Sequence, residues 1–217
     1  MAIEVMLVDD HPIVRQGIKA VISQEPDIAI VAEASNGEEA VEMAKKVCPQ
    51  VIVMDITLPV LNGLEAGRQI LKLDKKAKLL ILSMHENRVF IEKALACGMR
   101  GYVLKESAAD EIVEAIRKVY AGEYFLSSKI SSFIIEGFLS KKQISPLALK
   151  GSSILTSRER TVLQLISEGV SNKEIAQKLE IALKTVLVHR NNIMRKLNIH
   201  NQAQLIRFAL KEGLTSL

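Results

Sequence analysis

The chain has 217 residues, of which 48% are hydrophobic and 25% charged. This composition is close to that of average soluble globular proteins, so it excludes a mostly disordered, collagenous or low-complexity chain. The net charge is only +4, but residues 1–149 carry −2 and residues 150–217 carry +6. A basic C-terminal third behind a mildly acidic body indicates a polyanionic partner for that third and a different role for the rest.

The N-terminal residues are not typical of a targeting segment. They lack a basic stretch and run from a short apolar pattern into Asp9 and Asp10, unlike a signal peptide. No apolar run approaches the roughly 18 residues that a membrane-spanning helix requires. We therefore expect a soluble, cytoplasmic protein that does not bind membranes.

The two cysteines, Cys48 and Cys97, stand in separate apolar contexts, without a CxxC motif or a neighbouring His/Cys cluster. A disulfide or a zinc site needs paired or clustered ligands. Isolated thiols in apolar surroundings behave as small hydrophobic side chains. We expect both cysteines to be buried free thiols.

Residues 3–126 alternate short apolar runs with longer segments in which apolar residues recur at helical spacing. The runs predict β-strands at Ile3–Val8, Ile28–Ala34, Val51–Met54, Leu79–Leu82 and Gly101–Leu104. Parallel neighbours need crossover connections, and these are usually helices. We therefore predict an α/β domain with a five-stranded, doubly wound parallel sheet that is covered by helices on both faces.

The sequence after residue 126 predicts a change of fold class. A helical stretch over 127–140 leads into an irregular connection near 141–153, which contains Pro146 and Gly151. The remainder predicts four short helices, three of which begin with capping-box patterns: Thr156 to Glu159, Ser171 to Glu174 and Asn201 to Gln204. The expected parts are an α/β domain over 1–126, a linker helix and flexible linker over 127–153, and a small all-α domain over 154–217.

Polar residues follow four of the predicted strands: Asp9 and Asp10 the first, Asp55 the third, Ser83 the fourth and Lys105 the fifth. Because ligands of an open α/β sheet bind outside the carboxyl ends of its strands, we expect these side chains to converge. Three carboxylates in one pocket repel each other unless a cation holds them, and an all-oxygen ligand set favours Mg²⁺. A lysine and a hydroxyl group beside them suit a transferred phosphoryl group. The cluster therefore predicts phosphoryl transfer onto an aspartate.

Each of these residues also has a structural explanation of its own. Acids at strand ends often cap the following helix, Lys105 could be a solvated surface lysine and Ser83 a turn residue. Their occurrence in order, each directly after a strand, favours the functional interpretation.

The segments around these residues resemble the receiver domain of two-component response regulators, over residues 1–125. The resemblance rests on Val-Asp9-Asp10-His-Pro, Val-Met-Asp55-Ile-Thr-Leu-Pro59, Leu-Ser83-Met and Gly-Tyr-Val-Leu-Lys105. It implies a flavodoxin-like fold in which Asp55 accepts phosphate from a cognate sensor histidine kinase. It further implies Mg²⁺ binding by Asp9, Asp10, Asp55 and the Thr57 carbonyl, phosphoryl contacts from Ser83 and Lys105, and a conformational switch formed by Ser83 and Tyr102. A strand aromatic that fills the core is an equally good explanation of Tyr102.

Two positions depart from the receiver pattern. Leu58 precedes Pro59 where the family commonly has Met-Pro, a change that conserves side-chain volume. Glu106 stands where many members have a proline that is joined to the lysine by a cis bond. A cis bond before a residue other than proline costs about 2.5–4 kcal/mol, so the geometry of this loop stays open.

The helices predicted over 171–179 and 183–198 are separated by a short turn and form a helix-turn-helix candidate. If Val186, Ile193 and Leu197 are buried, helical spacing places five residues on the opposite face: Lys184, Leu187, Val188, Asn191 and Arg195. Outward cations and amides suit the major groove of duplex DNA. A solvated helix face is the alternative, and the +6 charge of residues 150–217 favours DNA.

This region resembles the LuxR-type DNA-binding domain, and together with the receiver the whole chain is similar to the NarL/FixJ subfamily of response regulators. The motifs are Leu155-Thr-Ser-Arg-Glu-Arg160, Gly169-Val-Ser-Asn-Lys-Glu-Ile-Ala176, Lys184-Thr-Val-Leu-Val-His-Arg190 and Arg195-Lys-Leu197. The resemblance implies that the helix over 184–197 lies in the major groove and that the last helix contributes to dimerisation. The residues expected to contact DNA are Lys184, Thr185, Leu187, Val188, His189, Asn191, Arg195 and Lys196. For His189, a packed neutral imidazole is as good an explanation as a phosphate contact.

Two departures fall on this helix. Ala182 stands where the family usually has a Ser or Thr N-cap, whose loss costs about 0.5–2 kcal/mol of helix stability. Leu187 stands where the family usually has Lys. An apolar side chain there can contact a thymine methyl group, but it removes a cation. We therefore expect DNA binding that is weaker than in the family or that selects a different sequence.

The combined hypothesis is a transcription regulator, not an enzyme, in which phosphorylation of Asp55 controls homodimerisation and binding to double-stranded promoter DNA. One rival is an aspartyl-phosphate phosphatase, but such enzymes need a second acid two residues beyond the nucleophile, where this chain has Thr57. The other rival is a phosphate-independent regulator with a vestigial receiver. The complete set of Asp9, Asp10, Asp55, Ser83 and Lys105 argues against it.

Overall fold

The computed structural model of the chain describes residues 2–84, 86, 88–139, 154–212 and 214. These residues form two compact units, each with its own buried core, and each is described by itself. The linker predicted near 141–153 lies outside the described residues. No helix in the described part of the chain is long and apolar enough to cross a membrane.

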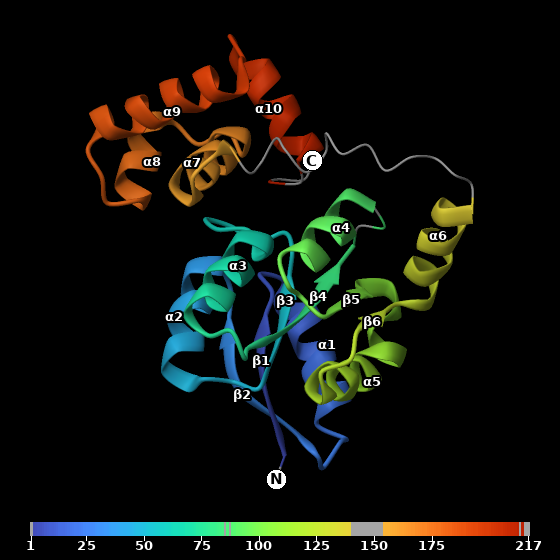
Figure 1. Cartoon of the computed structure of the whole chain (residues 1–217). Helices are drawn as coiled ribbons and strands as arrows, with labels where there is room; N and C mark the ends of the chain where they lie inside the picture. The colour runs from blue at the N-terminus through green and yellow to red at the C-terminus, as the bar shows by residue number, and fades with distance from the viewer. Residues whose placement is uncertain (1, 85, 87, 140–153, 213, 215–217) are drawn as a thin grey trace. The chain divides into compact units, whose positions relative to one another are not determined.

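The first unit is built around a parallel sheet with the strand order β2-β1-β3-β4-β5-β6 (Figure 1). Its strands are β1 (Ile3–Val8), β2 (Ile28–Ala34), β3 (Val51–Asp55), β4 (Lys78–Ser83), β5 (Gly101–Leu104) and β6 (Phe125–Leu126). The predicted parallel sheet is confirmed, but it has six strands, not five. The additional strand β6 pairs only Phe125 and Leu126 with β5, a length too short to produce a periodic pattern in the sequence.

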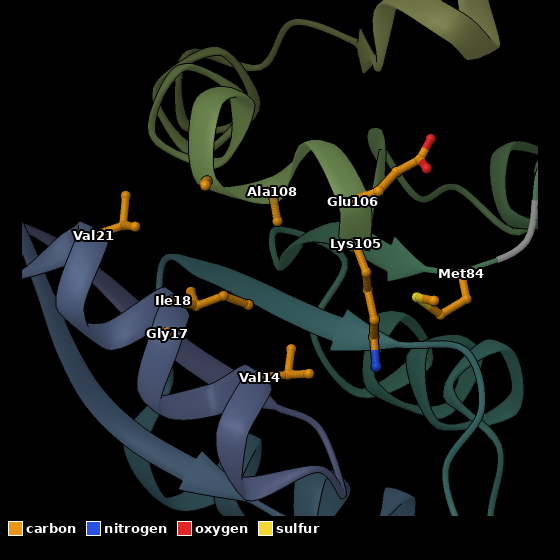
Figure 2. A pocket seen from close by; sticks show the side chains of 9 residues that line it. Val14, Gly17, Ile18, Val21, Met84, Lys105, Glu106 and Ala108 are labelled. Atoms are coloured by element: carbon orange, nitrogen blue, oxygen red, sulfur yellow. The ribbon is translucent and has the colours of Figure 1, made fainter.

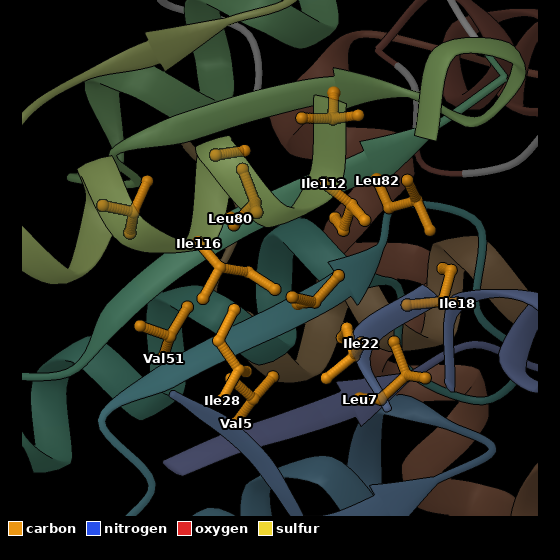
Figure 3. Close-up of a cluster of buried hydrophobic side chains, with 14 of the residues drawn as sticks. Val5, Leu7, Ile18, Ile22, Ile28, Val51, Leu80, Leu82, Ile112 and Ile116 are labelled. Carbon is orange, nitrogen blue, oxygen red and sulfur yellow. The ribbon is translucent and has the colours of Figure 1, made fainter. Parts of the chain in front are cut away.

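Helices cover both faces of this sheet, as predicted. The helices of this unit are α1 (Pro12–Ile22), α2 (Gly37–Val47), α3 (Gly63–Leu73), α4 (Arg88–Ala96), the 3₁₀-helix η1 (Lys105–Ser107), α5 (Ala108–Ala121) and α6 (Ser128–Leu139). On one face, α1 and α5 bury Ile18, Ile22, Ile112 and Ile116 against alternate strand residues such as Leu7 (Figure 3). The side chains between those strand residues point to the opposite face, where α2 and α3 pack against each other.

The central strands are buried on both faces. In β1, the side chains of Val5, Met6, Leu7 and Val8 are all fully buried. Strands of this kind form near-continuous apolar runs in a sequence, because neither face of the sheet meets water. This is why the central strands β1, β3, β4 and β5 were predicted within a residue of their bounds.

The second unit consists of the four predicted helices, α7 (Ser157–Ser167), α8 (Asn172–Lys178), α9 (Leu183–Leu197) and α10 (Gln202–Lys211). Complete capping boxes open α7 at Thr156 and α8 at Ser171. Asn201 caps α10 by accepting a hydrogen bond from the Gln204 backbone N–H at 2.9 Å. The side chain of Gln204 accepts from the backbone N–H of His200 instead of returning to Asn201, so this box is not closed.

The prediction of buried thiols is wrong for Cys48, which is exposed, while Cys97 is partly exposed. Cys48 takes a left-handed conformation with φ 50° at the end of α2, and its sulfur donates back to the Lys45 carbonyl at 3.6 Å. The sulfur of Cys97 accepts a hydrogen bond from Arg68 Nη2 at 3.2 Å. Both cysteines are free thiols, as predicted.

Two glycines of the first unit should respond in opposite ways to a methyl group. A Cβ at Gly17 in α1 would meet no atom within 4 Å, whereas a Cβ at Gly63 would lie 1.9 Å from the backbone oxygen of Asp55. Gly17→Ala should therefore raise the free energy of unfolding by about 0.5–1 kcal/mol through reduced chain entropy. Gly63→Ala should lower it by about 1–3 kcal/mol or more through overpacking. Urea unfolding followed by circular dichroism measures both, and equal shifts of the two variants would contradict this packing.

Candidate functional site

The strand order brings the predicted polar residues to one edge of the sheet. Asp9 follows β1, Asp55 ends β3, Ser83 ends β4 and Lys105 follows β5, and these four strands are neighbours in the sheet. All four run parallel, so their carboxyl ends share this edge. Asp9, Asp10, His11 and Asp55 each place a possible ligand atom within 4.8 Å of the others. The predicted convergence of the acids is confirmed.

Lys105 bridges two of these acids. Its ammonium nitrogen lies 2.7 Å from Asp55 Oδ2 and 2.6 Å from Asp9 Oδ2. The three side chains are 7%, 4% and 0% exposed for Lys105, Asp55 and Asp9. Figure 2 shows the lysine extending from η1 past the strand end. Two buried carboxylates are thus held together by one buried cation.

Burial and charge oppose each other at this pair. Burial is the largest influence on Asp55 and raises its pKa; Lys105 lowers it and Asp9 raises it again, and the pKa ends above its ordinary value. For Lys105, burial alone would lower the pKa, but the charges of Asp55 and Asp9 outweigh burial and raise it. The ammonium of Lys105 is therefore held in its charged form.

The donor atoms of the cluster fit a hard divalent cation. Asp9 Oδ2 and Asp10 Oδ1 are buried and, within the described residues, accept no hydrogen bond of good geometry. Lys105 Nζ lies 2.6 Å from Asp9 Oδ2, and His11 Nδ1 lies 2.8 Å from Asp10 Oδ1. These neighbours supply charge or polarity but not the angles of a well-formed hydrogen bond. Lys105 offsets one of the three carboxylate charges. Buried oxygens with free lone pairs and excess negative charge are what Mg²⁺ requires.

Ser83 and Tyr102 meet at the same edge of the sheet, on the neighbouring strands β4 and β5. Both are fully buried, and Tyr102 is among the largest fully buried side chains of the chain. Burial raises the pKa of Tyr102, and the hydrogen bond between its hydroxyl and Ser83 opposes this rise only in part. Tyr102 therefore fills the core, and its hydroxyl is hydrogen-bonded to Ser83 at the end of β4.

The loops that flank the cluster are tied to it by backbone groups. The Thr57 backbone N–H donates to Asp55 Oδ1 at 3.0 Å, which fixes one oxygen of that carboxylate. After β5, every peptide bond in the described residues is trans, so no cis bond joins Lys105 to Glu106. Glu106 is directed outward and pairs with Lys129 at 2.5 Å. The loop after Lys105 therefore has a trans backbone, with Glu106 at the position where many receivers have a proline.

Two residues of the site were not predicted. The backbone N–H of His11 donates to Asp9 Oδ1 at 2.8 Å, and its ring lies against Asp10. Arg15 Nη1 donates to the backbone oxygen of Asp9 at 2.6 Å. The position of His11 directly after the two acids, before Pro12 at the start of α1, was the one available signal.

An apolar pocket of about 410 Å³ lies beside Lys105. Figure 2 shows its wall of α1 side chains facing the segment at the end of β5. The lining comes from α1 (Val14, Gly17, Ile18, Val21), from Met84 after β4, and from Lys105, Glu106, Ala108 and Ala109. Met84 is 72% exposed, and the neighbouring Ile13 is 86% exposed. Apolar surface open to solvent thus borders the acidic cluster.

In the second unit, α9 presents the predicted face to solvent. Val186 and Ile193 are fully buried and Leu197 is partly buried. The exposed residues of this helix include Lys184, Thr185, Leu187, Val188, Asn191 and Arg195. The predicted division of α9 into two faces is therefore confirmed. The N-cap Ala182 makes no side-chain hydrogen bond, as expected from its missing hydroxyl group.

The remaining two candidates on α9 are placed differently. Lys196 is bound to the buried Glu159 of α7, with 2.6 Å between Lys196 Nζ and Glu159 Oε2. His189 is partly buried. The ion pair connects α9 to the capping box of α7, because the same Glu159 oxygen accepts from the Thr156 backbone N–H at 2.7 Å. Lys196 thus has a structural partner that the sequence did not indicate.

Both parts of the chain are similar to known protein families. Residues 5–117 match the family described as response regulator receiver domain, and residues 153–209 match the family described as bacterial regulatory proteins, luxR family. The chain is 35% identical over 222 residues to the transcriptional regulatory protein DegU of Brevibacillus brevis, covering 97% of this chain and 94% of that protein. It is 37% identical over 214 residues to the transcriptional regulatory protein MctR of Rhizobium johnstonii, covering 99% and 96%.

A solved structure supports the same relationship for part of the chain. A two-component response regulator of the LuxR family from Aurantimonas sp. SI85-9A1 shares 41% sequence identity with the chain and superimposes with a TM-score of 0.62. The match covers 64% of this chain and 99% of that one.

The ion pair of Glu159 and Lys196 predicts a pH-dependent contribution to stability. Burial would raise the pKa of Glu159, but hydrogen bonds from Lys196 and Thr156 outweigh burial and lower it. A lowered folded-state pKa stabilises the fold above the ordinary glutamate pKa, and this contribution is lost as pH falls through the folded-state value. Lys196→Met should therefore lower the free energy of unfolding by about 1.5–3 kcal/mol near neutral pH and by less in acid.

Urea unfolding of the variant and the parent near pH 7 and in acid measures this difference. Lys173→Met, at an exposed lysine of α8, is the matched control and should change stability by less than about 0.5 kcal/mol. A Lys196→Met deficit that is absent, or that stays constant as the pH falls, would contradict the assigned pair.

Proposed function

The chain belongs to the two-component response regulators of the NarL/FixJ type, and on that basis we propose that phosphorylation of Asp55 controls its dimerisation and DNA binding. A receiver domain and a LuxR-type DNA-binding domain in one chain make it a transcription regulator. We assign the receiver to residues 1–126, the linker to 127–153 and the DNA-binding domain to 154–217. The observation that carries the proposal is Asp55, buried at the strand end and bridged to Asp9 by Lys105.

The proposed reaction moves a phosphoryl group from a phosphohistidine of the kinase to Asp55. A carboxylate oxygen of Asp55 attacks phosphorus, a P–O bond forms, and the P–N bond to the histidine breaks with its electron pair remaining on the imidazole nitrogen. Asp9, Asp10, Asp55 and the Thr57 carbonyl would hold Mg²⁺, which when bound neutralises charge on the phosphoryl oxygens. The Thr57 backbone N–H orients one Asp55 oxygen. The Lys105 ammonium is placed to pair with the negative charge that the phosphoryl group brings to Asp55.

The chain's own residues favour a stable acyl phosphate over turnover of external phosphoesters. Two residues beyond Asp55 stands Thr57, which cannot act as a general acid as a carboxylic acid would. We therefore propose that Asp55 stores the phosphoryl group as a signal.

Transmission of the signal is proposed to begin at Ser83. A phosphoryl oxygen on Asp55 offers the Ser83 hydroxyl a charged acceptor, and charged acceptors form stronger hydrogen bonds than a neutral phenol does. When Ser83 turns to the phosphoryl group, Tyr102 loses its partner. This biases the receiver between two arrangements of the edge formed by β4 and β5.

The proposed partners follow from the two surfaces. The exposed apolar border around Ile13, Val14 and Met84 is suited to a helix of a sensor histidine kinase, next to the phosphoacceptor. The exposed face of α9 is suited to the major groove of double-stranded promoter DNA, and the activated form is proposed to bind it as a homodimer. Because DNA is the proposed target, we place this activity in the cytoplasm.

Asp55→Asn should abolish the response to a small phosphodonor. With acetyl phosphate and Mg²⁺, the parent chain should shift toward a dimer in sedimentation velocity, and this shift should disappear on chelation of Mg²⁺ or in the variant. Asn lacks the nucleophilic charged oxygen but has nearly the same shape.

Asp74→Asn provides the matched control, because Asp74 is an exposed acid that does not belong to the acidic cluster. It should respond as the parent does. Phosphodonor-dependent dimerisation that survives in Asp55→Asn would overturn the proposed switch.

A further inference from the structure

The DNA-facing side of α9 carries exposed apolar side chains among its cations. Leu183, Leu187 and Val188 are 40%, 42% and 49% exposed. They lie in the first six residues of a helix that contains Lys184, Arg190, Arg195 and Lys196 and no acidic residue. Exposed large apolar side chains at such a position cost solvation free energy, so they call for a partner.

The helix geometry sets the arrangement of this face. Buried Val186 and Ile193 fix which side of α9 faces inward. At roughly 100° per residue, Lys184 and Arg195 then lie close to the centre line of the outer face. Val188 lies about 30° to one side of that line, and Asn191 and Leu187 lie about 30° and 70° to the other side. The two apolar side chains therefore flank one cation and one amide within the first two and a half turns, about the length that a recognition helix inserts into a groove.

The charge around this face favours a nucleic acid over a protein surface. Among the described residues, no carboxylate lies within salt-bridge distance of Lys184 or Arg195. Within the described residues, Arg195 Nη2 donates to Oδ1 of the neutral Asn192 side chain at 3.0 Å. Uncompensated cations beside apolar groups match a surface that offers both phosphates and methyl groups. Duplex DNA offers both, because the C5-methyl group of thymine projects into the major groove.

We propose that Leu187 and Val188, with Asn191 between them, make this chain select A·T base pairs, through contact with thymine C5-methyl groups. This inference rests on the proposed DNA-binding function and adds the chemical class of the sequence read. Asn191 can donate to N7 and accept from N6 of adenine in a bidentate pair, which specifies the same base pairs. A lysine at position 187 would instead favour guanine, so this one side chain decides between a preference for A·T and a preference for G·C base pairs.

Thymine methyl groups can be removed one at a time, which gives a direct test. The full chain, phosphorylated with acetyl phosphate, is used to select duplexes from a random pool, and each thymidine of a selected duplex is then replaced by deoxyuridine. At one or two positions in each half-site, loss of the methyl group should weaken binding about threefold to fivefold. The same replacements should leave binding by Leu187→Ala nearly unchanged at the position that Leu187 contacts.

Two further variants separate the alternatives. Leu187→Lys should shift the selected sequence toward guanine at that position and make the affinity fall more steeply with salt. Leu73→Ala, at a leucine of the first unit that is 58% exposed, is the matched control and should keep the deoxyuridine response of the parent.

Selected duplexes that bind equally well with thymidine and deoxyuridine would overturn the inference while leaving DNA binding intact. A Leu187→Ala variant with altered dimerisation but an unchanged deoxyuridine response would also overturn it, and would assign the patch to a contact between chains. Failure of the phosphorylated chain to bind any duplex would overturn the proposed function and this inference together.

Discussion

The contact of Lys105 with Asp9 and Asp55 is the constraint on which the first unit depends. Two buried carboxylates at one sheet edge would each lose solvation and repel the other, and the single ammonium between them offsets part of both costs. The contact is available only because β1, β3, β4 and β5 are neighbours, so that their carboxyl ends lie in one row. The same edge then has oxygens left over for a divalent cation and a hydroxyl group, Ser83, beside them.

A partly buried ion pair performs a comparable task in the DNA-binding domain. Glu159 closes the capping box of α7 and at the same time binds Lys196 on α9. One carboxylate thus fixes the start of one helix and the rotation of another. With Val186 and Ile193 buried, the pair holds the exposed face of α9 in a single orientation. The missing side-chain cap at Ala182 is in this way partly offset by tertiary contacts along the helix.

Much of the fold could be predicted from the sequence, for an identifiable reason. Strands buried on both faces form unbroken apolar runs, and the residues directly after them are then drawn to one edge by the parallel topology. The sequence alone could therefore place four residues at one edge of the sheet: Asp9, Asp55, Ser83 and Lys105. Two of the four helices of the second unit, α7 and α8, were predictable because capping boxes at Thr156 and Ser171 mark their starts.

The remaining features depend on contacts that no local pattern encodes. Strand β6 is two residues long, and its place in the sheet is set by pairing with β5. The partnership of Glu159 and Lys196 joins residues 37 positions apart, and Lys196 had been expected at the DNA only through the family resemblance. The exposure of Cys48 follows from the left-handed end of α2 and not from the apolar residues around it. His11 reaches the site from the residue that precedes α1, and Arg15 reaches it from the first turn of α1.

The central claim is that Asp55, among three neighbouring carboxylates, receives the phosphoryl group. An acyl phosphate is reduced by borohydride to an alcohol, which converts the modified aspartate to homoserine, whereas free carboxylates do not react. Peptide mass spectrometry of the chain treated with acetyl phosphate, Mg²⁺ and borohydride locates that homoserine. The account predicts homoserine at residue 55 alone, and homoserine at residue 9 or 10, or at none of the three, would contradict it.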